Sequence, residues 1–377
     1  MKQGWPTEPL MSLCELFADG DWIESKDQSS EGIRLIQTGN VGEGVFKDRG
    51  EKARYISAAT FERLRCREIF EGDCLVSRLP EPAGRSCMLP DTGERMITAV
   101  DCTIVRFSAQ KIIPEFFNFY SQSREYLKEI DGETTGTTRK RISRSKLGEV
   151  LVPVPPLSEQ QRIVSILDEA FEGISKARSN AEKNLLNARE LFDSTLNAVT
   201  GERAFLGDYV TIKTGKLDAN AATEDGVYPF FTCAKEVYSI DKFAFDCEAI
   251  LLAGNNAVGD FNVKHYRGKF NAYQRTYVIT LNDESSLLYR FLYYQMLKSL
   301  KRFKEQSVGS GTKFLKIGMI KELEISLPSI PEQSLIIGML DAVLQESLRL
   351  ETLYQKKLAA LDDLKKSLLH QAFTGNL

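Results

Sequence analysis

Residues 153–201 read PVPPLSEQQRIVSILDEAFEGISKARSNAEKNLLNARELFDSTLNAVTG, and residues 328–375 read PSIPEQSLIIGMLDAVLQESLRLETLYQKKLAALDDLKKSLLHQAFTG. The two stretches are versions of one pattern. Their matching positions are Glu159-Gln160 with Glu332-Gln333, Leu167-Asp168 with Leu340-Asp341 and, with one residue inserted, Ala198, Thr200 and Gly201 with Ala372, Thr374 and Gly375. A repeat of this length indicates two copies of one module, each a globular part followed by a long helix.

Each repeat has the periodicity of a long amphipathic helix. The first follows Pro155-Pro156, which suits a helix start, and we expect Ser158 to be its N-cap and Gly201 its stop. Apolar or small residues then recur at steps of mostly three, four or seven, which is a heptad-like seam. The seam positions are Ile163, Leu167, Ala170, Ile174, Ala177, Ala181, Ala188, Leu191 and Ala198 in the first repeat, and Ile337, Leu340, Val343, Leu350, Tyr354, Leu361, Leu364 and Leu368 in the second.

A helix of about 40 residues is about 60 Å long and cannot bury its apolar stripe against one small domain. The other copy is the natural partner, and two repeats related by a pseudo-twofold axis favour antiparallel pairing. We therefore predict a mixed α/β protein whose two long helices form an antiparallel coiled coil. The predicted parts are a first globular domain at 1–152, a helix at 153–203, a second globular domain at 204–327 and a helix at 328–377. A generic bundle or a dimerisation coiled coil is the alternative interpretation of the helices.

Bulk composition is that of a globular protein. The chain has 377 residues, 42% hydrophobic and 27% charged, with a net charge of −3. The chain has no apolar run of about 20 residues, so no membrane span is predicted, and no secretory signal is evident. We therefore expect a cytoplasmic protein. The seven cysteines are odd in number and lack a CxxC pair, which favours reduced thiols, and two histidines make a zinc site improbable.

Both globular parts carry short β-rich runs between Gly, Asn and Pro turns, with one aromatic helical segment late in each. The aromatic segments are PEFFNFYSQSREYLKEI (114–130) and LLYRFLYYQMLKSLKRF (287–303). The two parts keep a framework and differ in their loops. Two recognition domains for different targets would look this way, and so would an old, drifting duplication.

A basic run precedes each long helix. Residues 136–146 contain no acidic residue, and residues 298–316 contain only Glu305. Lysine and arginine among Thr, Ser and Gly suit contacts to phosphate, although a solvated surface stretch is the alternative. The candidate phosphate-binding residues are Thr137, Thr138, Arg139, Lys140, Arg141, Arg144, Lys301, Arg302, Lys304, Thr312, Lys313 and Lys316. Lys146 and Lys298 belong to the same runs.

Bases in a groove are read by Arg, Lys, Asn or Gln on loops. The candidates here are Gln37, Asn40, Arg78 and Arg85 in the first part, and Asn255, Asn256, Lys264, Gln274 and Arg275 in the second. Ordinary turn or surface chemistry is the alternative for each of them, and Asn255-Asn256 after Gly254 is first of all a turn signal.

Signatures of catalysis are missing. The segment GSGTKF (309–314) lacks the spacing of a phosphate-binding loop, and no amino-methyltransferase motif or Pro-Cys dipeptide occurs. His265 and His370 are too few for histidine-based hydrolysis. The sequence thus indicates a binding protein without catalytic or metal residues of its own.

The doubled Pro/Glu-Gln/Leu-Asp helix resembles the central and C-terminal repeats of type I restriction–modification specificity subunits, the HsdS family. The turns TGNV (38–41), GDCLVSR (72–78) and LLAGNNAVG (251–259) resemble that family's target-recognition domains. The resemblance covers essentially the whole chain, and its one departure is the Ile330-Pro331 entry to the second helix.

The resemblance implies a subunit that binds a bipartite duplex DNA target, one half-site per recognition domain, with the helices setting the gap. It implies two docked modification (methyltransferase) subunits and further restriction (motor-endonuclease) subunits. S-adenosylmethionine, ATP and Mg would be bound by those partners and no cofactor by this chain. The repeated helix positions become candidates for partner binding: Glu159, Gln160, Leu167, Asp168, Glu332, Gln333, Leu340 and Asp341.

Two other classes of function remain open. A coiled-coil scaffold would organise protein partners without touching DNA. A cryptic nuclease or fused methyltransferase would show metal-dependent or S-adenosylmethionine-dependent activity in the purified chain, and the missing motifs count against it.

Overall fold

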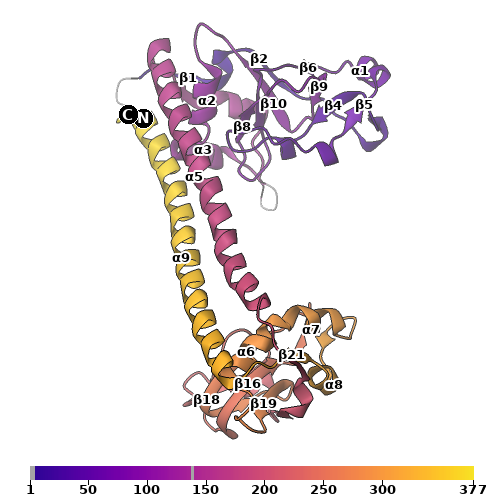
Figure 1. The fold of residues 1–377 in the computed structure, drawn as a ribbon. Helices are drawn as coiled ribbons and strands as arrows, with labels where there is room; N and C mark the ends of the chain where they lie inside the picture. Colours follow the sequence, from indigo (N-terminus) through magenta and orange to yellow (C-terminus); the bar gives the residue numbers. More distant parts are fainter. Residues whose placement is uncertain (1–4, 137–139) are drawn as a thin grey trace. The chain divides into compact units, whose positions relative to one another are not determined.

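The computed structural model describes residues 5–136 and 140–377 and has the predicted mixed α/β architecture (Figure 1). The chain divides into two compact units. The first contains residues 1–181 and 357–377, and the second contains residues 182–356. Each long helix contributes one part to each unit, so the two globular regions are built on segments far apart in the sequence.

The long helices are α5 (Leu157–Asn197) and α9 (Ile330–Thr374). The expected N-cap at Ser158 is wrong, because α5 already begins at Leu157 and the carbonyl of Pro156 accepts hydrogen bonds from the backbone of the first turn. In α9, the Ser329 hydroxyl and backbone N–H both donate to the Glu332 carboxylate, at 2.6 and 2.8 Å. That arrangement satisfies donors at the helix entry.

The helices pair in an antiparallel sense within each unit, as predicted. In the first unit Arg178 forms an ion pair with Asp362, and the Lys365 ammonium lies 4.9 Å from the centre of the Phe171 ring. In the second unit Arg189 lies 3.5 Å from Glu351. Residue numbers on one helix rise as those on the other fall, which fixes the direction of pairing.

The apolar seam is largely as predicted, with three errors: Leu191 and Leu364 at equivalent positions, and Ala198, which is exposed just beyond the end of α5. Leu167, Ala181, Ala188 and Leu340 are buried, whereas Leu191 and Leu364 are 44% and 46% exposed. Both exposed leucines follow the preceding seam residue by three positions, a step that with 3.6 residues per turn falls about 60° short of a full turn. In α5 the neighbouring residue Phe192 takes the inward position.

The globular region of the first unit contains three sheets. A four-stranded antiparallel sheet has the order β2 (Cys14–Asp19), β10 (Cys102–Phe107), β7 (Cys74–Ser77), β8 (Ser86–Met88). A five-stranded mixed sheet has the order β3 (Gln28–Ser29), β5 (Tyr55–Ile56), β4 (Ile33–Ile36), β9 (Met96–Thr98), β6 (Glu68–Ile69). A ribbon pairs β1 (Thr7–Pro9) with β11 (Leu151–Pro153). The shorter helices are α1 (Ala58–Leu64), α2 (Pro114–Tyr120), α3 (Arg124–Glu133) and α4 (Arg144–Glu149).

The second unit is built on one six-stranded sheet. Its order is β13 (Val210–Thr214), β19 (Thr276–Leu281), β16 (Phe245–Ala253), β18 (Val263–Ala272), β14 (Tyr228–Phe231), β15 (Tyr238–Ile240). Two ribbons pair β12 (Arg203–Phe205) with β21 (Glu324–Ser326) and β17 (Asn255–Asn256) with β20 (Lys313–Phe314). The helices are α6 (Tyr289–Lys298), α7 (Leu300–Gln306) and α8 (Ile317–Lys321).

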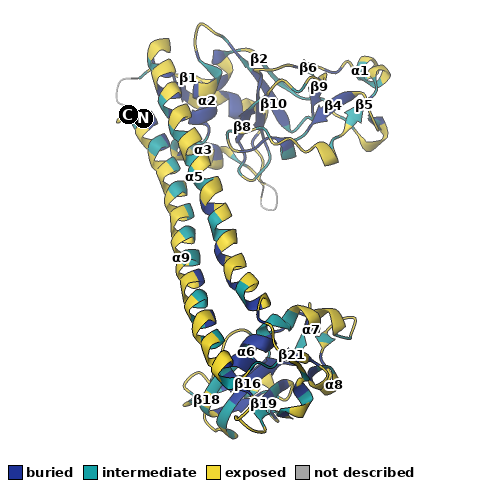
Figure 2. Ribbon diagram, viewed as in Figure 1, coloured by how far each residue is buried: buried dark blue, intermediate teal, exposed yellow. Residues whose placement is uncertain are grey.

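The two units share a framework. The order β2-β10-β7-β8 corresponds to β13-β19-β16-β18, and the ribbon β1–β11 corresponds to β12–β21. The aromatic segments form α2–α3 and α6–α7, which pack into the main core of their unit against part of a long helix (Figure 2). The units differ by the five-stranded sheet of the first and by β14–β15 and β17–β20 of the second.

Three further observations concern the whole described chain. None of its helices combines the length and apolar character needed to cross a membrane. Within residues 5–136 and 140–377, no three His, Cys, Asp or Glu side chains are grouped so as to hold a metal ion. All seven cysteines lie in these ranges and are free thiols.

Candidate nucleic-acid interface

A buried glutamine from α5 joins the long helix to the first globular region. Gln160 is 0% exposed. Its Oε1 accepts a hydrogen bond from the backbone N–H of Ile113 at 2.8 Å, and its Nε2 donates to the carbonyls of Lys111 and Pro155 at 3.1 and 2.8 Å. Ile113 is the N-cap of α2 and has no cap of its own, so the long helix supplies one.

Gln333 of α9 makes the same connection in the second unit. It is 0% exposed and accepts from the backbone N–H of Leu288 at 2.9 Å. Its Nε2 donates to the carbonyls of Ser286 and Pro328, both at 2.8 Å. We call Gln160 and Gln333 the lock glutamines, because each fixes the start of an aromatic helix relative to a long helix.

The lock glutamines correct the partner-binding hypothesis for half of its residues. Gln160, Leu167, Gln333 and Leu340 are all 0% exposed and lie inside the units, where a docked protein cannot reach them. The sequence held a signal of this, because each lock glutamine lies seven residues before the buried leucine and therefore on the same helix face. Glu159, Asp168 and Glu332 remain at least partly exposed.

The eighth candidate, Asp341, has a partner within its own unit. Arg290 of α6 donates to its carboxylate from Nε at 2.9 Å, and the Tyr294 hydroxyl also donates to it. Burial opposes the charge, but the hydrogen bonds from Arg290 and Tyr294 hold the pKa of the Asp341 carboxyl below its usual value. In the first unit the corresponding Asp168 is near Glu115 instead, and desolvation together with that charge raises the pKa of Asp168.

The basic run of the first unit is neutralised by carboxylates. Thr137, Thr138 and Arg139 lie outside the described residues. The other basic side chains have these partners: Lys140 with Asp131 at 2.5 Å, Arg141 with Asp101 at 3.0 Å, Arg144 with Asp19 at 3.7 Å and Lys146 with Glu133 at 3.3 Å. A phosphate would have to compete with these acids.

The basic run of the second unit differs. In the described part of the chain, none of Lys301, Arg302, Lys304, Lys313 and Lys316 forms an ion pair with a carboxylate. The stems of Lys304 and Lys313 converge beside Gly259, in the turn that follows β17. Thr312 immediately precedes β20. The uncompensated positive charge near the β17–β20 ribbon suits a polyanion.

Three of the four base-reading candidates in the first unit hold the fold together. Arg85 is only 9% exposed. Its guanidinium donates hydrogen bonds to the carbonyls of Val41, Leu79, Pro82 and Thr38 at 2.7 to 2.9 Å. Arg78 is 4% exposed and donates to Val100 O, and Asn40 bridges Gln37 N and Lys47 O. We therefore assign these three to loop architecture. Gln37 is partly exposed.

The second unit leaves more of its candidates available. Asn256 is used in a turn, where Oδ1 accepts from the backbone of Val258 and Asp260, and the Lys264 ammonium donates to Ala234 O at 2.6 Å. Gln274 is exposed and donates to Asp218 at 2.5 Å. Arg275 is exposed, and its guanidinium has no hydrogen-bond or ion-pair partner among the described residues. Asn255 is partly exposed beside Phe314.

One group of basic residues was missed from the sequence. Gln37 lines a small cavity of about 110 Å³ together with Arg49, Lys52 and Arg54. These three residues belong to the segment KDRGEKAR (47–54), in which basic residues alternate with two acidic residues around Gly50. In the sequence the two acidic residues partly balance the basic ones, so the segment does not stand out as a basic run. In the structure Asp48 is paired with Arg34, which leaves this loop more basic than its composition indicates.

Comparisons with known proteins agree with this architecture. The family described as "Type I restriction modification DNA specificity domain" matches residues 2–183 and 200–360. The type I restriction enzyme EcoDI specificity subunit of Escherichia coli is 47% identical over 141 residues. That match covers 37% of this chain and only 30% of the relative.

Two solved structures share the fold over the whole chain. A chain from a study of complex assembly and conformational transition of the type I R-M system has a TM-score of 0.78 at 18% identity, with 100% of this chain and 99% of that chain covered. The HsdS subunit from Thermoanaerobacter tengcongensis has a TM-score of 0.59 at 16% identity, with coverage of 100% and 98%. Because the family match extends over both units and most of both long helices, the chain belongs to the type I restriction–modification DNA specificity family.

Proposed function

We propose that this chain binds a bipartite duplex DNA sequence and reads one half-site with each globular region. The observation that carries the proposal is the repeated framework with different additions, because a shared scaffold with unlike loops can present unlike surfaces to two half-sites. Membership of a specificity-domain family assigns the chain a recognition role and not a catalytic one. Phosphate contacts would set the register of each unit, and loop side chains would read bases in the major groove.

The proposal extends to partners. Two modification subunits carrying S-adenosylmethionine would dock on the long helices, and restriction subunits using ATP and Mg would join them in the cytoplasm. Exposed apolar side chains on the helices support such docking. Leu335 is 76% exposed, Leu348 55% and Leu186 57%. These residues replace the buried lock glutamines and leucines as the proposed contact surface.

The direct test is a selection from randomised duplex DNA, with the full chain and the modification subunit encoded beside it. We expect the enriched pool to contain two short defined blocks separated by a fixed unspecified gap. A pool without enrichment, from a complex that is folded and assembled, would favour the protein scaffold instead.

A second test addresses the helices as a spacer between the half-sites. Deleting residues 182–188 and 352–358 removes one heptad from each helix at paired levels and retains the lock glutamines. The loss of seven residues shortens each helix by about 10 Å, which is the length of about three base pairs. We expect the selected gap to change while both half-sites stay the same. Deleting seven residues from α5 alone is the matched control, and it should disrupt pairing. An altered half-site with an unchanged gap would count against a spacer role.

The basic run of the second unit makes a separate prediction. Replacing Lys304 and Lys313 with glutamine should weaken binding to every DNA sequence alike. It should also reduce the slope of log affinity against log salt concentration by about 1.8, since about 0.9 is lost for each phosphate contact. Fluorescence anisotropy over a salt series measures both quantities.

The matched control is the pair Lys140→Gln and Lys146→Gln in the first unit. These lysines already have carboxylate partners, so we expect a smaller change in slope. If the Lys304 and Lys313 variant lost its preference at one base position only, these residues would read bases and not phosphates.

A further inference from the structure

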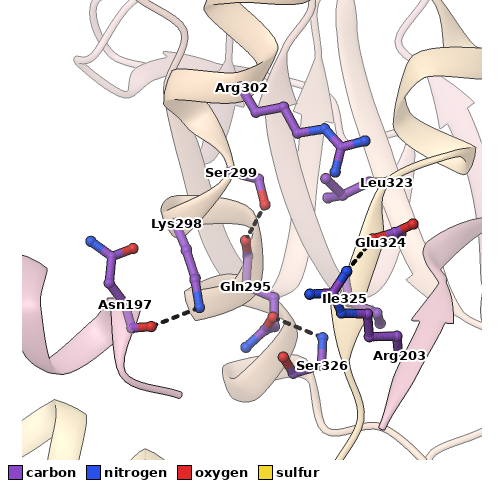
Figure 3. Close-up of a pocket in the computed structure, with 10 residues that line it drawn as sticks. All are labelled: Asn197, Arg203, Gln295, Lys298, Ser299, Arg302, Leu323, Glu324, Ile325 and Ser326. Carbon is purple, nitrogen blue, oxygen red and sulfur yellow. Dashed lines mark hydrogen bonds and ion pairs between the residues drawn. The ribbon is translucent and has the colours of Figure 1, made fainter. Parts of the chain in front are cut away.

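The second unit contains a polar cavity beside the start of its aromatic helices. Its volume is about 360 Å³, and it lies between the end of α5, the helices α6 and α7, and the β12–β21 ribbon (Figure 3). The side chains that concern its chemistry are Arg203, Gln295, Lys298, Ser299, Arg302 and Glu324. All belong to one unit.

Two residues in this region differ between the copies, and one of them, Gln295, lines the cavity. Counted from the backbone N–H that each lock glutamine caps, Gln295 stands where the first unit has Tyr120. The helix ends differ in the same way, because Ala-Val-Thr-Gly (198–201) replaces Ala-Phe-Thr-Gly (372–375). In the first unit the rings of Tyr120 and Phe373 pack with their centres 5.2 Å apart. An amide and a valine fill much less space than these two rings.

Gln295 is buried and has an unused donor. The residue is 4% exposed, and its Oε1 accepts a hydrogen bond from the backbone N–H of Ser326 at 3.2 Å. That bond fixes the amide orientation, and its Nε2 is left buried without a partner among the described residues. Buried polar groups are nearly always hydrogen-bonded to protein, water or a ligand, so this donor beside the cavity still requires an oxygen acceptor.

The side chains around the cavity carry an excess of positive charge, which favours a bound anion. The Lys298 ammonium donates to the carbonyls of Asn197 and Val199, both at 3.1 Å, and retains a third N–H. Arg203 has one contact with Glu324, at 3.2 Å, and Arg302 has no ion-pair partner among the residues that the structure describes. Three cations therefore face one carboxylate.

We propose that this cavity binds a single phosphate group. Figure 3 shows Lys298 and Gln295 on one side and the guanidinium groups of Arg302 and Arg203 on the other. The oxygens of a tetrahedral phosphate point in several directions and can accept hydrogen bonds from donors on both sides of the cavity. The two oxygens of a carboxylate lie in one plane. The group could be a backbone phosphate of DNA or a free phosphate. Only the DNA source rests on the proposed function, because the affinity of the cavity for phosphate does not depend on sequence recognition.

The first arm of the test follows thermal unfolding of the full chain in inorganic phosphate, with chloride and acetate at matched ionic strength and pH. We expect phosphate alone to raise the unfolding temperature in a concentration-dependent way, because a ligand that binds only the folded state stabilises it. Arg302→Gln should weaken the apparent phosphate affinity by about tenfold, since a charge-assisted hydrogen bond is lost. Lys301→Gln, on the neighbouring residue outside the cavity, should respond like the wild type.

A second variant fills the cavity. Val199→Phe with Gln295→Tyr copies the aromatic pair of the first unit and should remove the phosphate effect while leaving the chain folded. If this variant does not fold, Arg302→Gln decides alone, because its side chain lies at the surface. Equal responses to phosphate and acetate, or no difference between Arg302→Gln and the wild type, would overturn the proposal.

The second arm identifies the source of the phosphate. A DNA backbone phosphate predicts that Arg302→Gln reduces the salt slope of DNA binding by about 0.9. An unchanged slope, with phosphate stabilisation present in the wild type, identifies free phosphate as the ligand. A failed selection for a bipartite sequence would refute the proposed function and leave the phosphate site standing.

Discussion

Replacing Gln333 with leucine should lower the free energy of unfolding of the second unit by about 3 kcal/mol. Leucine has a similar volume but no polar atoms, so the N–H of Leu288 and the carbonyls of Ser286 and Pro328 all lose their partner. Each buried polar group left unpaired costs about 1–3 kcal/mol. We expect faster hydrogen exchange at the start of α6, because the cap of this helix comes from α9.

The control is Gln345→Leu, a glutamine on the exposed surface of the same helix. We expect it to change stability by less than about 0.5 kcal/mol. The same substitution at Gln160, with Gln161→Leu as its exposed neighbour, should affect the start of α2 in the first unit. Hydrogen exchange followed by mass spectrometry is the appropriate measurement, because it reports on each unit separately where a single melting temperature does not. A normal exchange rate at α6 in Gln333→Leu would show that this glutamine is dispensable.

Replacing Arg85 with methionine should destabilise the first unit by about 4 kcal/mol. The guanidinium joins two separate loop segments through the carbonyls of Val41 and Thr38 and those of Leu79 and Pro82, and methionine leaves all four without this donor. Arg85→Lys should recover only part of the loss, because an ammonium cannot reproduce the planar fork. Burial lowers the pKa of the Arg85 guanidinium but leaves it charged at neutral pH.

The comparison for Arg85 is Arg275→Met in the second unit. Arg275 is exposed and without a side-chain partner in the described chain, so this change should leave stability intact and weaken DNA binding. Chemical denaturation and DNA binding should therefore separate the two arginines. If Arg85→Met were stable and lost recognition of one base pair, Arg85 would be a base-reading residue as the sequence first indicated.

Several features could be predicted from the sequence because they depend on local periodicity or on repetition. The mixed α/β class, the two long helices and their antiparallel pairing follow from the doubled pattern at 153–201 and 328–375. The predicted N-cap at Ser158 places the start of α5 too late, because the carbonyl of Pro156 already accepts the first hydrogen bonds of the helix. Leu191 and Leu364 are not part of the seam, because a three-residue step falls short of a full 3.6-residue turn and the buried face at that level of α5 belongs to Phe192.

Side-chain roles were less predictable. The Glu-Gln pair was recognised as a repeated feature, yet its glutamine faces inward and its glutamate outward. Adjacent residues on a helix are about 100° apart, so one can be structural while the other is exposed. Arg78 and Arg85 have the residue type of a base reader, but each is buried in its unit.

The sequence by itself determined the repeat, the helices, their pairing and the family, because these are written in the spacing of apolar and repeated residues. Only the tertiary structure decided which polar side chains are available. It paired the basic run at 140–146 with the nearby Asp131 and with Asp101 and Asp19 from distant segments, left the run at 301–316 uncompensated, and placed a cavity beside Gln295. The physical reason is that charge compensation and burial depend on contacts between residues far apart in the chain, which no local pattern specifies.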